Sequence, residues 1–247
     1  MSGHSKWSTI KRQKGVADAK RSKVFTRLTR EITLAARTGA DPELNPRLRL
    51  AVQKARDSNM PRDNIDRAIK KVSGADGNAA TLDEVTYEAY GPGGVAILLE
   101  VVTENRNRTA ADVKAALNKS GGSMGETGSV SWMFRTNGVL TVPVVGDEAD
   151  AIALSAIDAG AEDFTVDDDA IEIYCSPNAI EEIREVLESG GVAVTNAEVT
   201  QVPTATVSVD SKLADQTIRL LEKLEDLDDV QRVSTNADFP QEVAAEP

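Results

Sequence analysis

The order of strands and helices between residues 137 and 202 restricts most strongly how this chain can fold. Runs rich in Val, Ile, Leu and Thr predict strands, and runs with apolar residues three or four positions apart predict helices. Here the order is strand, helix, strand, strand, helix, strand, which is the split βαβ arrangement of a complete small α+β domain. The predicted strands are 138–143, 163–167, 170–175 and 192–201, and the predicted helices are 148–159 and 179–189.

The segments on either side of this domain complement each other. Residues 95–135 contain a strand (95–103), a helix (109–119) and a strand (129–135), and residues 205–235 repeat that order with a helix at 212–227 between strands at 205–209 and 230–235. A further strand is predicted at 84–90, and Gly91-Pro92-Gly93-Gly94 is turn chemistry between two strands. We therefore predict an α+β fold in which the domain 137–202 is inserted into a discontinuous α+β domain, also of split βαβ (ferredoxin-like) type, made of residues 80–136 and 203–240.

Three short amphipathic helices are predicted before residue 75. The first spans 19–37, Asn45-Pro46 is typical of the start of the second, and Pro61 opens the third. Each has one apolar face, so together they should close into a three-helix bundle. On the first helix this face consists of Val24, Phe25, Leu28, Ile32, Ala35 and Ala36, whereas Leu34 is an exception that lies on the opposite side.

Charge divides the chain at the end of the predicted bundle. Residues 1–72 contain 18 Lys or Arg and 7 Asp or Glu, whereas the remaining residues contain 10 and 33. The region 137–202 has 15 acidic residues and a single basic one, Arg184, so it is excluded as a phosphate-binding surface. A basic domain attached to an acidic body is typical of a nucleic-acid-binding module on a carrier. Residues 1–75 are therefore predicted to bind nucleic acid.

The N-terminal arm, residues 2–15, is polar and basic and has one aromatic residue, Trp7. Lys and Arg neutralise phosphates, and an exposed Trp ring stacks on an unpaired base for about 1–3 kcal/mol. The alternative is a solvated arm with Trp7 folded back on the bundle. The predicted contacts are His4, Lys6, Trp7, Lys11, Arg12 and Lys14.

A basic stripe runs along the first helix, opposite its apolar face. The alternative is a solvated face that keeps the protein soluble, but such faces normally mix both signs, and only Glu31 lies near the edge of this one. Phosphate contact is therefore favoured for Lys20, Lys23, Arg27 and Arg30, and Arg37 continues the stripe.

Residues 103–109, Thr-Glu-Asn-Arg-Asn-Arg-Thr, lie between a predicted strand and a helix start. Exposed N–H groups and the helix dipole favour an anion there, and the guanidinium groups of Arg106 and Arg108 would each donate paired hydrogen bonds to it. The alternative is N-capping by Asn107 or Thr109 with both arginines facing solvent. The glycine-rich stretch 121–128 follows a helix and lacks Gly-Lys-Ser/Thr, so it is not a P-loop; we expect a flexible connection.

Other functions find little support in the sequence. The single His and single Cys give too few ligands for a zinc site and no catalytic constellation, so we predict no enzyme activity, no metal and no cofactor. The longest apolar run, 95–99, is far shorter than the roughly 20 residues of a membrane helix. We expect a cytoplasmic protein with no membrane contact and no small-molecule substrate.

An ordered set of motifs along the whole chain resembles the YebC family. They are Met-Ser-Gly-His-Ser-Lys-Trp at 1–7, Asp-Ala-Lys-Arg at 18–21, Asn-Pro at 45–46, Ser-Asn-Met-Pro at 58–61, Tyr-Gly-Pro-Gly-Gly-Val-Ala at 90–96, the stretch 103–109, Gly-Gly at 121–122 and Gly-Ser-Val at 128–130.

The resemblance implies a cytoplasmic, non-enzymatic protein of three domains, the first helical and the others α+β. Bacterial members are described as DNA-binding transcriptional regulators, whereas mitochondrial relatives are translational activators and some bacterial members are linked to stalled ribosomes. Two hypotheses stay open: a DNA-binding regulator, and a ribosome-associated factor that contacts ribosomal RNA. The basic face offers few Asn or Gln partners for base edges, which indicates backbone contact and suits either nucleic acid.

Overall fold

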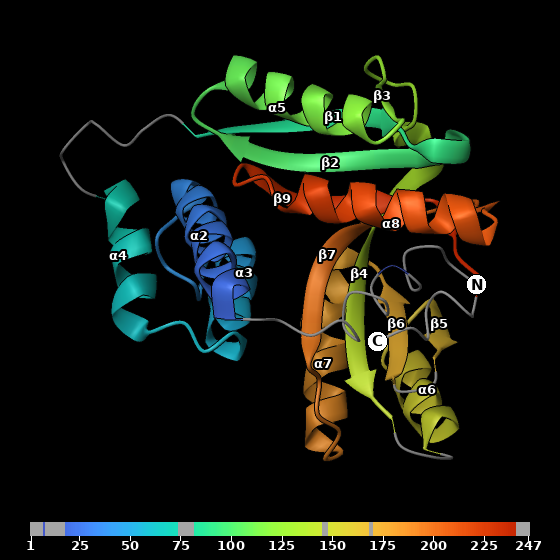
Figure 1. The fold of residues 1–247 in the computed structure, drawn as a ribbon. Helices are drawn as coiled ribbons and strands as arrows, with labels where there is room; N and C mark the ends of the chain where they lie inside the picture. The colour runs from blue at the N-terminus through green and yellow to red at the C-terminus, as the bar shows by residue number, and fades with distance from the viewer. Residues whose placement is uncertain (1–6, 8–17, 74–81, 145–147, 168–169, 241–247) are drawn as a thin grey trace.

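The computed structural model describes residue 7 and residues 18–73, 82–144, 148–167 and 170–240. It has a helical unit followed by two sheet units, each of which carries helices on one face (Figure 1). The predicted α+β fold class is confirmed. The residue limits of the three domains stay a prediction.

The helical unit consists of α2 (Asp18–Ala35) with the 3-10 turn Ala36–Thr38, α3 (Pro46–Asp57) and α4 (Arg62–Ser73). The predicted apolar face of α2 lies in the core of this bundle, together with residues of α3 and α4. Asn45 caps α3 as expected: its side-chain oxygen accepts a bond from the Leu48 N–H at 3.1 Å, and its amide donates to the Ala35 and Gly39 carbonyls. Because α3 packs against β7 and α2 against β9, α4 is left on the outer side of the molecule (Figure 1).

The first sheet has the order β3-β1-β2-β9, with all neighbours antiparallel. Its strands are β1 (Asp83–Tyr90), β2 (Ala96–Thr103), β3 (Ser123–Met124) and β9 (Val230–Thr235). The helices α5 (Arg106–Lys119) and α8 (Ser211–Glu225) share one apolar core with it. The turn predicted between β1 and β2 is present as the 3-10 turn Pro92–Gly94, in which Gly93 has φ 75°.

The second sheet has the order β5-β6-β4-β7 and is also antiparallel. Its strands are β4 (Phe134–Pro143), β5 (Asp163–Val166), β6 (Ala170–Cys175) and β7 (Asn196–Pro203). The helices α6 (Ala149–Asp158) and α7 (Ile180–Ser189), the latter preceded by the 3-10 turn Pro177–Ala179, pack against one face. In chain order this unit is strand, helix, strand, strand, helix, strand, as predicted for residues 137–202.

Two predicted strands, 129–135 and 205–209, are not formed as predicted, and the strand predicted at 192–201 begins later, at Asn196 of β7. Residues 129–135 do not form a separate strand, because the 3-10 turn Ser131–Met133 leads into β4, which continues through Gly138. Gly138 is predicted as a strand start, but it lies within β4, and glycine is required there because a side chain would collide with Ile180 and Cys175. At 205–209 only β8 (Val207–Ser208) forms, paired in parallel with β10 (Ala237–Asp238). In the sheet, β2 therefore lies between β1 and β9, and residues 205–209 supply neither of its neighbours.

Candidate nucleic-acid interface

The basic side of α2 faces the first sheet unit instead of solvent. Lys23 forms an ion pair with Asp226 at 3.1 Å, and Arg30 forms one with Asp229 at 3.1 Å while its guanidinium also donates to the Asp228 carbonyl. Arg37 donates to the Leu82 carbonyl at 2.6 Å. Residues 226–229, which we call the acidic turn, connect α8 to β9. Two cations of the stripe predicted for phosphate, Lys23 and Arg30, are thus neutralised within the molecule.

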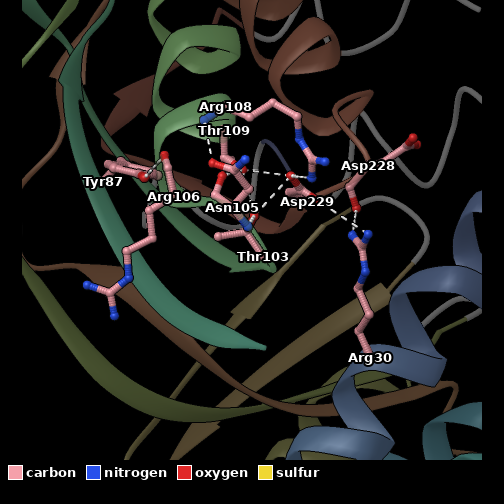
Figure 2. A network of polar contacts seen from close by, with 9 residues as sticks. All are labelled: Arg30, Tyr87, Thr103, Asn105, Arg106, Arg108, Thr109, Asp228 and Asp229. Carbon is pink, nitrogen blue, oxygen red and sulfur yellow. Dashed lines mark hydrogen bonds and ion pairs between the residues drawn. The ribbon is translucent and has the colours of Figure 1, made fainter. Parts of the chain in front are cut away.

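Asp229 is the centre of this contact (Figure 2). Its side chain is 8% exposed and accepts bonds from the Thr109 hydroxyl at 2.6 Å and from Arg108 at 2.7 Å, besides the ion pair with Arg30. Burial opposes ionisation of this carboxyl, but these hydrogen bonds and the two guanidinium charges outweigh it, so the pKa of Asp229 lies below its ordinary value. The site already holds a bound anion, and that anion is a side chain of the protein.

The segment 103–109 serves mainly to begin α5. The N-cap is Asn105, not the expected Asn107 or Thr109, and its side chain accepts from the Arg108 N–H at 3.1 Å. Arg106 pairs with Asp83 at 2.8 Å, and its carbonyl accepts a bond from the Tyr87 hydroxyl (Figure 2). Arg106 and Arg108 keep 60% and 55% of their side chains exposed, so both can still meet an anion, but each already has a carboxylate partner.

Trp7 is placed differently from the predicted stacking residue. It is 6% exposed and lies in the core shared by the first sheet, α5 and α8, where its Nε1 donates to Glu225 at 3.3 Å. A buried ring cannot stack on a base, so this expectation is corrected. The alternative of a folded-back Trp7 is closer to the structure, but the ring packs on the first sheet unit and not on the bundle.

The remaining predicted contacts are less completely described. His4, Lys6, Lys11, Arg12 and Lys14 lie outside the described residues, and Lys20 lies on α2 without a described side chain. Arg27 is half-buried, and its Nε has no hydrogen-bond partner among the described residues.

A basic surface that the sequence reasoning overlooked lies on the outer side of the bundle. A groove of about 550 Å³ runs between α3 and α4, with Arg56, Arg62 and Lys70 around an apolar floor that includes Met60 and Ile65. Arg62 is 3.8 Å from Asp66. In the part of the chain that the structure describes, no ion pair is formed by four exposed cations of α3 and α4: Arg56, Arg67, Lys70 and Lys71.

A signal for this arrangement was present in the sequence. Leu34, the apolar exception on the basic side of α2, packs with Leu82 and Val102 of the first sheet unit. A single large apolar residue on an otherwise charged helix face indicates that this face meets another domain.

Comparison with known proteins assigns the chain to a family. Residues 5–75 match the family model described as the TACO1/YebC protein N-terminal domain, and residues 82–237 match that of the TACO1/YebC second and third domain. The chain belongs to the TACO1/YebC family.

Curated relatives of this TACO1/YebC chain cover nearly its full length. A protein of Dehalococcoides mccartyi strain 195 is 54% identical over 98% of this chain and 97% of its own, and one of Thermomicrobium roseum is 50% identical over 98% of each. Both are named probable transcriptional regulatory proteins. The crystal structure of a conserved hypothetical protein from Aquifex aeolicus is similar with a TM-score of 0.82 and 42% identity, over 90% of this chain and 92% of that one.

The TACO1/YebC chain offers little for metal or thiol chemistry within the described residues. No group of three or more His, Cys, Asp or Glu side chains there is placed to hold a metal ion. Cys175 is buried, and burial raises the pKa of its thiol to about 11. Among the described helices, none has both the length and the apolar character to cross a membrane.

Proposed function

We propose that this protein is a cytoplasmic, non-enzymatic nucleic-acid-binding regulator that acts as a DNA-binding regulator of transcription. The observation that carries the proposal is the set of exposed cations on α3 and α4, namely Arg56, Arg67, Lys70 and Lys71, which lack carboxylate partners in the described part of the chain. Unpaired cations gain most from phosphate, because binding releases the counterions of the nucleic acid without breaking an internal ion pair. The names of the full-length relatives agree with this function.

The negative charge of the second sheet unit supports binding of nucleic acid by the bundle. The second sheet unit has 15 acidic residues and one Arg between residues 137 and 202, so it repels a polyanion. Arg184 is itself paired with Glu188 at 2.8 Å and lies 3.5 Å from Asp57 of α3. The main contacts with the phosphate backbone are therefore expected on the outer face of the bundle.

A ribosome-associated role in translation is the second candidate, and the composition of α4 favours it. The exposed positions of this helix carry Arg, Lys and Asp, whereas its one amide residue, Asn64, is half-buried. Reading of base edges in duplex DNA relies on Asn, Gln and Arg in defined positions. A face without exposed amides fits contact with the backbone, which the folded RNA of a ribosome also offers.

The test compares two variants that remove the same amount of charge from different places. The bundle variant changes Arg56, Arg67, Lys70 and Lys71 to Gln. The control variant changes four exposed cations of α5 and α8 to Gln, namely Lys114, Lys119, Lys212 and Arg219. Each protein is titrated with duplex DNA and with purified ribosomes at one salt concentration. The proposal predicts that duplex binding weakens only in the bundle variant. Ribosome binding that depends on the bundle, with no duplex binding by any protein, would select the translation role.

A further inference from the structure

Trp132 is the exposed tryptophan of this chain. Its side chain is 70% exposed, whereas Trp7, the other tryptophan, is buried. It lies in the 3-10 turn Ser131–Met133, which enters β4. Large apolar rings are normally removed from water, so a ring left outside and held in place needs a separate explanation.

The residues before and after Trp132 in the sequence are anchored in the protein core. Val130 and Phe134, two residues before and two after it, are buried in one apolar cluster with Ala96 and Leu98 of β2. The indole Nε1 donates to the Ser129 carbonyl at 3.1 Å. The edge of the ring is thus fixed while most of its surface remains open.

A buried carboxylate holds the segment that precedes the ring. Glu88 of β1 is 6% exposed and accepts three backbone N–H bonds, from Gly128 and Val130 at 2.6 Å and from Ser131 at 2.9 Å. Burial opposes ionisation of Glu88, but these donors outweigh it, so the pKa of the carboxyl lies below its ordinary value. The glycine-rich stretch that sequence reasoning treated as a flexible connection is therefore tied to the sheet at its end.

The surroundings of Trp132 distinguish a base from a protein partner. The exposed residues near it in the chain are small, polar or charged, namely Glu126, Thr127, Ser131, Arg135 and Thr136. The other exposed large apolar side chains of the described residues lie elsewhere, Leu44 in the bundle and the rest in the second sheet unit. Protein interfaces have a contiguous buried core, whereas a lone aromatic ring among small and polar residues is typical of a stacking platform for nucleic acid.

We propose that Trp132 is a stacking site for one unpaired nucleobase. The inference rests on the proposed function, since it assumes that the protein meets nucleic acid, and it narrows the ligand to single-stranded or looped segments. Bases within a duplex are already stacked and offer no free face without a cost of a few kcal/mol. Trp132 therefore selects unpaired regions, whereas the bundle cations bind any phosphate backbone.

Tryptophan fluorescence tests the proposal directly, because stacking on a base quenches indole emission. Trp7→Phe leaves Trp132 as the only tryptophan, and Trp132→Phe leaves only Trp7. Both proteins are titrated with a 12-nucleotide oligoadenylate RNA and a 12-base-pair DNA duplex, while anisotropy of the labelled nucleic acid reports binding separately. We expect the RNA to quench the Trp7→Phe protein strongly and the Trp132→Phe protein hardly at all.

The affinities give the second readout. Trp132→Ala should weaken binding of the single strand about 5- to 100-fold, the equivalent of one base-aromatic stack, and leave duplex binding unchanged. If the RNA binds with no quenching of Trp132 and no loss in Trp132→Ala, the stacking site is overturned while the proposed function stands. If the protein binds the duplex but not the single strand, the stacking site is also overturned, and a protein partner becomes the explanation for the exposed Trp132 ring. If neither nucleic acid binds, both proposals fall.

Discussion

At the scale of single residues, the two tryptophans show how far composition can mislead. Trp7 follows a basic, polar segment that indicates an exposed arm, yet its ring completes the core beneath α5 and α8. Nothing in the local pattern identifies a core position in a segment without periodicity, because the partners of Trp7 lie more than 80 residues away in sequence. The local pattern predicts a strand at Trp132, but its exposure depends on a turn that is fixed by Glu88, which lies more than 40 residues away in sequence.

Replacing the two tryptophans separates these roles. Trp7→Ala should lower the free energy of unfolding by about 3–5 kcal/mol, because it removes a large buried side chain and leaves a cavity. Trp132→Ala, the matched control on an exposed ring, should change it by no more than about 0.5 kcal/mol. Urea denaturation followed by circular dichroism measures both. Equal small effects would mean that Trp7 does not belong to the core.

At the scale of elements, helix faces and caps were predictable and strand partners were less so. The apolar face of α2, the Asn45 cap and the β1–β2 turn follow from local chemistry, and the structure confirms them. Sheet order depends on contacts between distant segments, and Gly138 interrupted the pattern of β4 for a packing reason that the strand itself does not reveal.

The candidate site was predictable in charge but not in position. A helical pattern shows that Lys23 and Arg30 share a face with Leu34, but not that the acidic turn lies against it. Removal of the α2 cations would therefore also break ion pairs between the bundle and the first sheet unit. Arg30, Arg108 and Thr109 converge on Asp229, so α2, α5 and the α8–β9 connection depend on one carboxylate.

The ionisation of Asp229 makes this junction sensitive to acid. Its folded-state pKa lies below the ordinary value of 3.8, so its contribution to stability is present above that pH and is lost as the pH falls through the lower folded value. Asp229→Asn should destabilise the protein by about 1–3 kcal/mol at pH 7, since it leaves the Arg30 and Arg108 charges without their partner. The difference in free energy of unfolding between the wild-type protein and Asp229→Asn should shrink as the pH falls from 5 to about 2. Urea denaturation at each pH measures this difference. A constant difference across that range would contradict the ionised junction.

At the scale of the whole molecule, the charge asymmetry has two uses. Part of the basic charge attaches the bundle to the acidic units, through Lys23, Arg30 and also Lys54, which pairs with Glu198 of β7 at 2.8 Å. Glu198 in turn binds Arg232 of β9 at 2.8 Å, so one carboxylate connects the bundle and both sheets. The net charge of residues 1–72 therefore overstates the charge available to a ligand.

Within the described part of the bundle, exposed cations without an ion pair lie on α3 and α4, and binding through them is the central claim. For about 5–8 neutralised phosphates, the logarithm of the duplex DNA binding constant should fall against the logarithm of salt concentration with a slope of about −4 to −7.

The decisive measurement is this slope for the parent protein, the bundle variant and the control variant. We predict that the slope of the bundle variant is less steep than that of the parent by about three to four units, because each lost phosphate contact contributes about 0.9 to the slope. The control variant should keep the parent slope. Equal slopes for the bundle variant and the parent, or a flattening of the same size in the control variant, would contradict the account.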